Sequence, residues 1–174
     1  MKSNQDSYVY TLTLKEKKTL VLGSSFIVYD SHDRERYSII ASSNSATLFS
    51  LPDNKIISKI KDSSSIFSIK KRSYSLYLNN KKIDELEITG YGVLKAREGI
   101  MTSYGWKFDI GGIRTVIYNK NKSPILEIVD ESNMHTDLFK CSMHYRNQED
   151  ELRGMFIMMY LVREYISVKS SDVE

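Results

Sequence analysis

The sequence predicts a mainly β protein: a closed antiparallel barrel of about twelve strands around a central hydrophobic C-terminal α-helix. Three observations support this fold class. Up to about residue 145 the chain consists of short segments in which apolar and polar residues alternate, separated by turn residues. The segment Met155–Val162 is apolar on every side of a helix, so it must be surrounded by protein. A sheet that closes around this helix would also leave no exposed strand edges.

The first half of the chain is expected to contain successive hairpins. Polar turns are expected at Asp30–Glu35, at Pro52–Asn54 and at Asn79–Asn80, because these residue types favour tight turns. The strands expected around these turns are residues 8–14, 26–29, 37–40, 47–51, 56–60, 74–78 and 83–88.

The clearest hairpin lies in the second half of the chain. Trp106–Ile110 and Ile113–Tyr118 flank Gly111-Gly112, and two glycines tolerate the positive φ angles of a type I′ turn. Further strands are expected at residues 125–129 and 138–145. In the last of these, alternate residues share one face: Phe139, Cys141, Met143 and Tyr145.

The final element is predicted to be a helix over about residues 148–166, with Asn147 as N-cap and the acidic residues Glu149–Glu151 in its first turn. The chain is expected to be a single domain over residues 1–174, with flexible tails at 1–7 and 168–174. No signal peptide is readable at the start. Charged residues interrupt the apolar helix, so no transmembrane segment is expected and we predict a cytoplasmic protein, with peripheral membrane contact open.

No catalytic constellation is visible, so we expect a protein that is not an enzyme and needs no cofactor or metal. Cys141 cannot form an internal disulfide because it is the only cysteine, and His144 lies three residues away, on the opposite face of the same strand. The loop 130–137 begins like a calcium loop but lacks its glycine and final glutamate. The acidic run Glu149–Glu151 is explained by the helix dipole.

Positive charge is concentrated in one stretch. Residues 45–82 carry a net charge of +6, whereas the rest of the chain carries −3. In a barrel these residues lie on neighbouring hairpins and could converge on one outer face, suited to anionic lipid headgroups or to nucleic acid. The candidate binding residues are Lys59, Lys61, Lys70, Lys71, Arg72, Lys81 and Lys82. Tyr74 and Tyr77 lie among them but on opposite strand faces, which argues against base stacking.

The hairpins Phe26–Ile39, Thr47–Ile60 and Tyr74–Ile88, with the apolar C-terminal helix, resemble the LURP-one-related proteins. These belong to the tubby C-terminal-like superfamily together with the phospholipid scramblases. The resemblance covers about residues 20–166, although His32-Asp33 and Asp53-Asn54 stand where the family usually has Asp-x-x-Gly turns.

The resemblance implies a twelve-stranded, scramblase-like barrel around a central helix, with a binding role instead of catalysis. Because tubby proteins use a basic surface for phosphoinositides, it favours an anionic phospholipid or membrane surface as the partner over nucleic acid. The alternative is a protein-interaction scaffold without lipid binding, which an exposed apolar patch or a co-purifying partner would favour. A third hypothesis is insertion of the C-terminal helix into a membrane, as proposed for scramblases.

Overall fold

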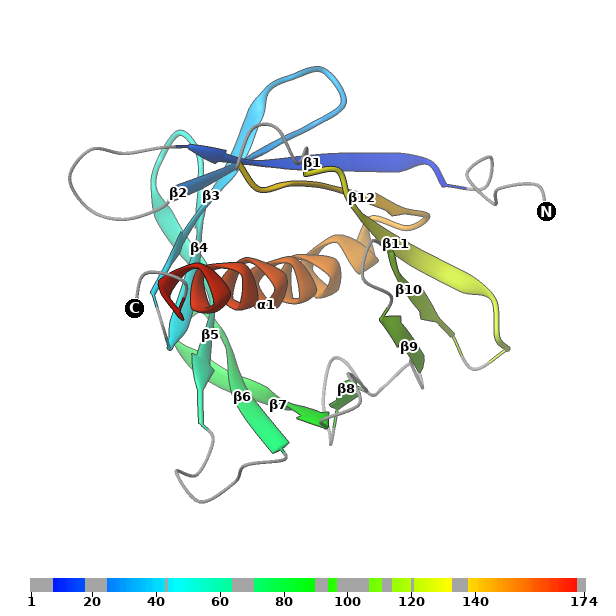
Figure 1. Ribbon diagram of the computed structural model, residues 1–174. Helices are drawn as coiled ribbons and strands as arrows, with labels where there is room; N and C mark the ends of the chain where they lie inside the picture. Colours follow the sequence, from blue (N-terminus) through cyan, green and yellow to red (C-terminus); the bar gives the residue numbers. More distant parts are fainter. Residues whose placement is uncertain are drawn as a thin grey trace.

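The computed structural model describes a mainly β protein in which one antiparallel sheet is followed by a C-terminal helix. The sheet curves around helix α1 (Glu149–Ser171), which lies in its hollow (Figure 1). The structure describes residues 8–17, 25–42, 44–63, 71–89, 94–96, 107–110, 114–119, 121–132 and 138–171.

The strands are joined as successive hairpins, except where the first strand pairs with the last. The order across the sheet is β8-β7-β6-β5-β4-β3-β2-β1-β12-β11-β10-β9. Their bounds are β1 (Tyr10–Lys17), β2 (Ser25–Tyr29), β3 (Glu35–Ala41), β4 (Ser45–Ser50), β5 (Lys55–Asp62), β6 (Lys71–Leu78), β7 (Lys81–Thr89), β8 (Leu94–Ala96), β9 (Lys107–Ile110), β10 (Arg114–Tyr118), β11 (Pro124–Asp130) and β12 (Lys140–Tyr145).

The predicted closure of the barrel is not confirmed. Within the described residues the sheet has two ends, β8 and β9, and no pairing joins them. β8 has three residues and β9 has four, so each edge presents few backbone groups to a partner strand. Short edge strands are one of the ways in which proteins protect an open sheet.

The predicted hairpin turns are confirmed where they are described. Asn79 and Asn80 have φ angles of 49° and 64°, as a type I′ turn between β6 and β7 requires. Asp33 and Asn54 also have positive φ, 57° and 54°, a conformation that Asx residues tolerate better than other non-glycine residues. β9 and β10 also pair as predicted, but the register of this hairpin differs. Ile110 pairs with Thr115, whereas a two-residue turn at Gly111-Gly112 would pair it with Ile113. Trp106 and residues 111–113 lie outside the described part.

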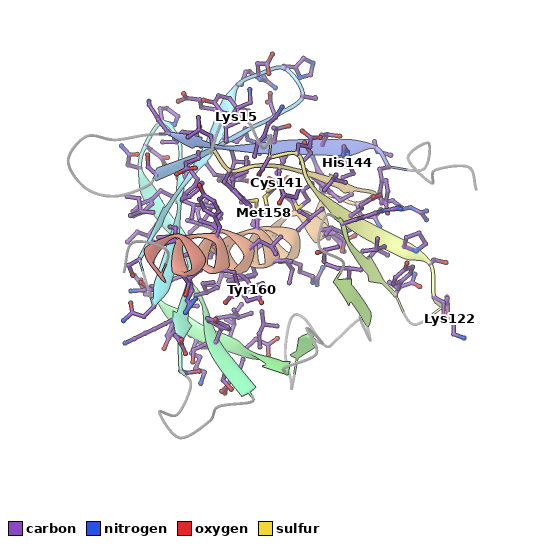
Figure 2. The ribbon with its side chains drawn as sticks, in the orientation of Figure 1. Lys15, Lys122, Cys141, His144, Met158 and Tyr160 are labelled. Atoms are coloured by element: carbon purple, nitrogen blue, oxygen red, sulfur yellow. The ribbon has the colours of Figure 1, made fainter. Side chains whose placement is uncertain are left out.

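The prediction that α1 is enclosed is confirmed. Met155, Phe156, Ile157, Met158 and Met159 are each at most 1% exposed. Successive helical residues are about 100° apart, so these five point to every side of the helix, and every side is covered. Figure 2 shows Met158 and Cys141 in the interior, between α1 and the sheet.

The helix is longer than expected. It begins at Glu149, where the carbonyl of Asn147 accepts the amide of Asp150 at 2.9 Å, and it continues to Ser171 instead of ending near residue 166. Residues 167–171 contain neither glycine nor proline, so nothing stops propagation of the helix. The predicted tail from residue 168 therefore starts too early.

Gly154 lies where α1 packs closely against side chains of β11 and β12. A Cβ atom at this position would lie 2.5 Å from Cδ1 of Leu126 and closer still to Sδ of Met143. Only a glycine therefore lets the helix pack at this depth without displacing these core side chains.

Candidate functional site

Six residues from six adjacent strands form one cross-strand row on the outer surface of the sheet. Each is paired with the next through the antiparallel registers of β2 to β7. We call these residues the outer row: Ser25, Ile40, Thr47, Lys59, Tyr77 and Lys82.

The outward direction of the outer row follows from strand alternation. On β5, Ser58 is 1% and Ile60 is 0% exposed, so both face the helix, and Lys59 between them faces solvent. On β6, the fully buried Leu76 places Tyr77 on the outer side. Lys61 lies two residues after Lys59 and is therefore on the same outer face.

Two of the predicted lysines line a surface hollow of about 270 Å³. We call it the basic hollow, and its lining residues are Lys59, Lys61, Tyr77 and Asn80. Tyr77 contributes to this hollow, whereas Tyr74 is fully buried on the inner face. The two tyrosines therefore lie on opposite faces, as the strand pattern predicts.

Of the seven predicted binding residues, the structure brings three together. Lys82 pairs across the strands with Tyr77, beside the basic hollow, and its Nζ lies 3.5 Å from Oε2 of Glu85. Lys81 is exposed at the start of β7. The backbone of Lys71 and Arg72 lies in β6, but their side chains are outside the described part, as is the whole of Lys70.

The chemistry of the basic hollow is that of an anion site. Ammonium groups, the Asn80 amide and the Tyr77 hydroxyl are all hydrogen-bond donors to phosphate or carboxylate oxygens. Within the described residues no three His, Cys, Asp or Glu side chains are grouped as metal ligands. Cys141 is fully buried on the inner face, where burial raises the pKa of its thiol. The thiol is therefore protonated and inert at neutral pH.

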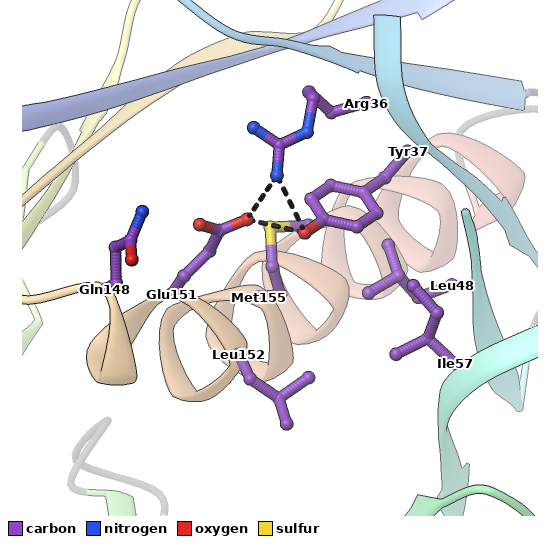
Figure 3. Close-up of a pocket in the computed structure, with 8 residues that line it drawn as sticks. All are labelled: Arg36, Tyr37, Leu48, Ile57, Gln148, Glu151, Leu152 and Met155. Carbon is purple, nitrogen blue, oxygen red and sulfur yellow. Dashed lines mark hydrogen bonds and ion pairs between the residues drawn. The ribbon is translucent and has the colours of Figure 1, made fainter. Parts of the chain in front are cut away.

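A second cavity, of about 350 Å³, lies beside the first turns of α1 (Figure 3). We call it the helix-start pocket. Its inner wall is apolar and its rim carries polar and charged groups. Its lining residues are Arg36, Tyr37, Leu48, Ile57, Gln148, Glu151, Leu152 and Met155.

Glu151 organises the rim of the helix-start pocket. Its Oε1 accepts the hydroxyl of Tyr37 at 2.5 Å, and its Oε2 accepts the hydroxyl of Tyr145 at 2.8 Å. The guanidinium of Arg36 lies 3.5 Å from Oε1 and over the Tyr37 ring, 5.4 Å from its centroid. Burial, together with the hydrogen bond to Glu151, raises the pKa of Tyr37 to about 12 and also raises the pKa of Tyr145.

The sequence gives no signal for this pocket. Glu151 is expected only to stabilise the helix dipole, because Tyr37 is 114 residues away along the chain. In the structure the same carboxylate also ties the start of α1 to β3 and β12. The arrangement holds a helix in place, and Arg36, Tyr37 and Glu151 on the rim already bind one another.

Polar contacts also hold the later half of α1. The Tyr165 hydroxyl donates to Oε2 of Glu16 at 2.8 Å, and the Tyr74 hydroxyl donates to Glu164 at 3.1 Å. Arg163, 3% exposed, lies 3.2 Å from Oδ2 of Asp62. Both halves of the helix are therefore fixed to the sheet by directional contacts. Among the described residues, no helix combines the length and the apolar character needed to cross a membrane.

The chain is similar to one solved structure at the level of fold. The X-ray structure of the Arabidopsis thaliana protein AT5G01750 matches with a TM-score of 0.53 and 9% sequence identity, over 95% of this chain and 96% of that chain. No protein-family model matches the sequence, and no curated protein matches it either. At this identity the similarity concerns the fold alone, and the site must be interpreted from its own chemistry.

Proposed function

We propose that this chain is a non-catalytic binding domain that docks on an anionic phospholipid surface through its basic face. The observation that carries the proposal is the convergence of Lys59 and Lys61 in one hollow with Tyr77 and Asn80, with Lys82 beside it. These donors suit the phosphate or carboxylate groups of lipids. The domain would then act at the periphery of a membrane, on its cytoplasmic side.

The charge on this face sets the expected strength of binding. A Lys or Arg near an anionic membrane contributes about 1 kcal/mol, so Lys59 and Lys61 supply roughly 2 kcal/mol, while the carboxylate of Glu85 offsets the charge of Lys82. This corresponds to an enrichment of about 25-fold at the surface, because each 1.4 kcal/mol is a factor of ten. The association is thus expected to be reversible and sensitive to salt.

Vesicle flotation tests the proposal. The chain is mixed with phosphatidylcholine vesicles with and without phosphatidylserine or a phosphoinositide, and the protein recovered with the vesicles is measured. We expect recovery only with anionic lipid, and at least a tenfold loss of binding for Lys59→Glu. Equal recovery on neutral and anionic vesicles would overturn the proposal.

Lys122→Glu is the matched control. Lys122 is exposed in the turn between β10 and β11, on the opposite side of the molecule from β5 (Figures 1 and 2). The Lys122→Glu substitution changes the net charge by the same amount as Lys59→Glu, at a distant position. If Lys122→Glu reduced recovery as much as Lys59→Glu, net charge would account for binding and the basic hollow would not.

The family assignment and the closure of the barrel are part of the proposal. We propose that the chain belongs with the LURP-one-related proteins and that β8 pairs with β9 to complete a barrel around α1. Their support is the order of the elements, hairpins followed by an enclosed C-terminal helix, and the covered circumference of that helix. A crystal structure with hydrogen bonds between β8 and β9 would establish closure, and one with separated edges would exclude it.

The second candidate function is a protein-interaction scaffold. It is favoured by exposed apolar side chains on the same face, since Ile40 is 54% and Ile56 is 42% exposed. A partner that co-purifies with the chain, and whose capture is lost with Ile40→Ser, would support this function. Binding to anionic vesicles that contain no protein would instead favour the membrane-binding function.

A further inference from the structure

We propose that Ile40, Phe49 and Ile56 form a shallow lipid-insertion patch, so that the domain binds the membrane with apolar side chains as well as with lysines. We call these three residues the apolar patch. The inference rests on the proposed function, which concerns only the charged headgroups, and adds contact with the acyl boundary below them.

Strand register places the three side chains together on the outer face. Phe49 on β4 pairs directly with Ile56 on β5. Ile40 on β3 pairs with Thr47, which lies two residues before Phe49 and on the same face. Diagonal neighbours of this kind are about 7–8 Å apart, within reach of large side chains.

The exposure of these residues is unusual within the described part of the chain. Three large apolar side chains are substantially exposed there, namely Val9, Ile40 and Ile56, and two of them are in the apolar patch. Phe49, between them, is half-buried. A single exposed apolar side chain is ordinary, but apolar side chains that adjoin one another on the surface mark an interaction site.

The charges around the apolar patch select a membrane over a protein as its partner. Thr47 pairs on its other side with Lys59, so the patch adjoins the basic hollow along the outer row. Lysine is depleted in protein–protein interfaces, whose cores are rich in aromatic residues, methionine and arginine. Apolar side chains flanked by lysines instead match the boundary between anionic headgroups and acyl chains.

This geometry predicts two separable contributions to binding. Lysines attract the domain to the surface, and salt weakens that attraction. Burial of isoleucine side chains does not depend on ionic strength in this way, so some binding should persist in high salt. We expect the double substitution Ile40→Ser and Ile56→Ser to lower vesicle affinity about tenfold and to remove the salt-resistant part, with an unchanged melting temperature because both side chains are exposed.

Site-directed fluorescence tests insertion directly. Single cysteines are introduced as Ile40→Cys, Ile56→Cys and, as a control, Asn121→Cys, and each is labelled with nitrobenzoxadiazole. Cys141 is fully buried, so the native protein should take up little label. Asn121 is exposed in the turn between β10 and β11, next to Lys122, which Figure 2 shows on the opposite side of the molecule from β5. The vesicles are phosphatidylcholine with 30% phosphatidylserine.

Insertion predicts a blue shift and a rise in emission for the labels at positions 40 and 56, and no change at position 121. Flotation of the labelled protein without a spectral change would overturn the insertion patch and leave the proposed function standing. Failure of the unlabelled chain to float would overturn the proposed function, and the insertion patch with it. A blue shift that appears without vesicles as protein concentration rises would indicate docking between copies of the chain and would also overturn insertion.

Discussion

Replacing Met158 with aspartate should unfold the domain at neutral pH. The side chain of Met158 is 0% exposed, in the middle of the apolar stretch of α1. If the helix is the core of the domain, a carboxyl group here has no water around it. If the helix instead leaves the sheet to enter a membrane, the isolated domain should tolerate the change.

Two costs set the size of the effect. Losing a buried methionine side chain costs about 2–5 kcal/mol. The new carboxyl must also be protonated to remain buried, and holding a group of ordinary pKa about 3.9 neutral at pH 7 costs roughly 4 kcal/mol, at 1.36 kcal/mol per pH unit. The sum, about 6–9 kcal/mol, removes between about half and all of the free energy of unfolding of a typical domain, about 5–15 kcal/mol.

Urea unfolding followed by far-UV circular dichroism at pH 7 and pH 4.5 measures this effect. We expect Met158→Asp to be unfolded or barely folded at pH 7 and to recover part of its stability at pH 4.5, where protonation costs little. Met158→Leu should cost less than about 1.5 kcal/mol because it conserves volume. Val9→Asp, the same kind of change at a residue that is 74% exposed, should be close to neutral. A Met158→Asp protein with nearly native stability at pH 7 would refute the enclosed helix.

Two further predictions concern how α1 is held. Gly154→Ala should destabilise the domain by up to about 2 kcal/mol in thermal unfolding. Crowding of Met143 and Leu126 costs about 1–3 kcal/mol, and replacing a helical glycine returns about 1 kcal/mol. A higher melting temperature would contradict the close approach. The pKa of Tyr37 is raised from 10.0 to about 12 in the folded state, so its contribution to stability is fully present below pH 10 and is lost as the pH rises through 12. Tyr37→Phe should therefore be less stable than the wild type at pH 8, by about 1 kcal/mol for the lost hydrogen bond. Between pH 10 and pH 12 it should lose less stability than the wild type. If the free energies of unfolding of the two proteins fell in parallel with pH, the bond to Glu151 would be contradicted.

Features determined by local chemistry could be predicted from the sequence. The apolar run Met155–Val162 is sufficient to require an enclosed helix, and Asn79-Asn80 is sufficient to specify a tight turn. Local rules also place Cys141 on the inner face. The sequence does not predict the end of α1, because no glycine or proline after residue 166 marks where the helix stops.

Features that depend on distant pairing could not be predicted. The register shift between Leu48 and Phe49 places Ile56, instead of Ile57, opposite Phe49, and a shift of one residue exchanges the two faces of a strand. The sequence therefore indicates that lysines are concentrated in one stretch, but not that Lys59 lies in a row with Ile40 and Tyr77. The contacts of Glu151 with Tyr37 and Tyr145 likewise require the complete sheet.

The position of α1 in chain order has a consequence for synthesis. The helix that fills the core is the last element of the described part of the chain, so the inner faces of the strands described here are made before their covering exists. A chain growing from its N-terminus on the ribosome exposes residues such as Phe26, Leu48 and Leu76, which are at most 1% exposed once folded. We therefore expect the nascent chain to be prone to aggregation until the helix emerges. A premature stop codon before residue 149 would leave this product permanently uncovered.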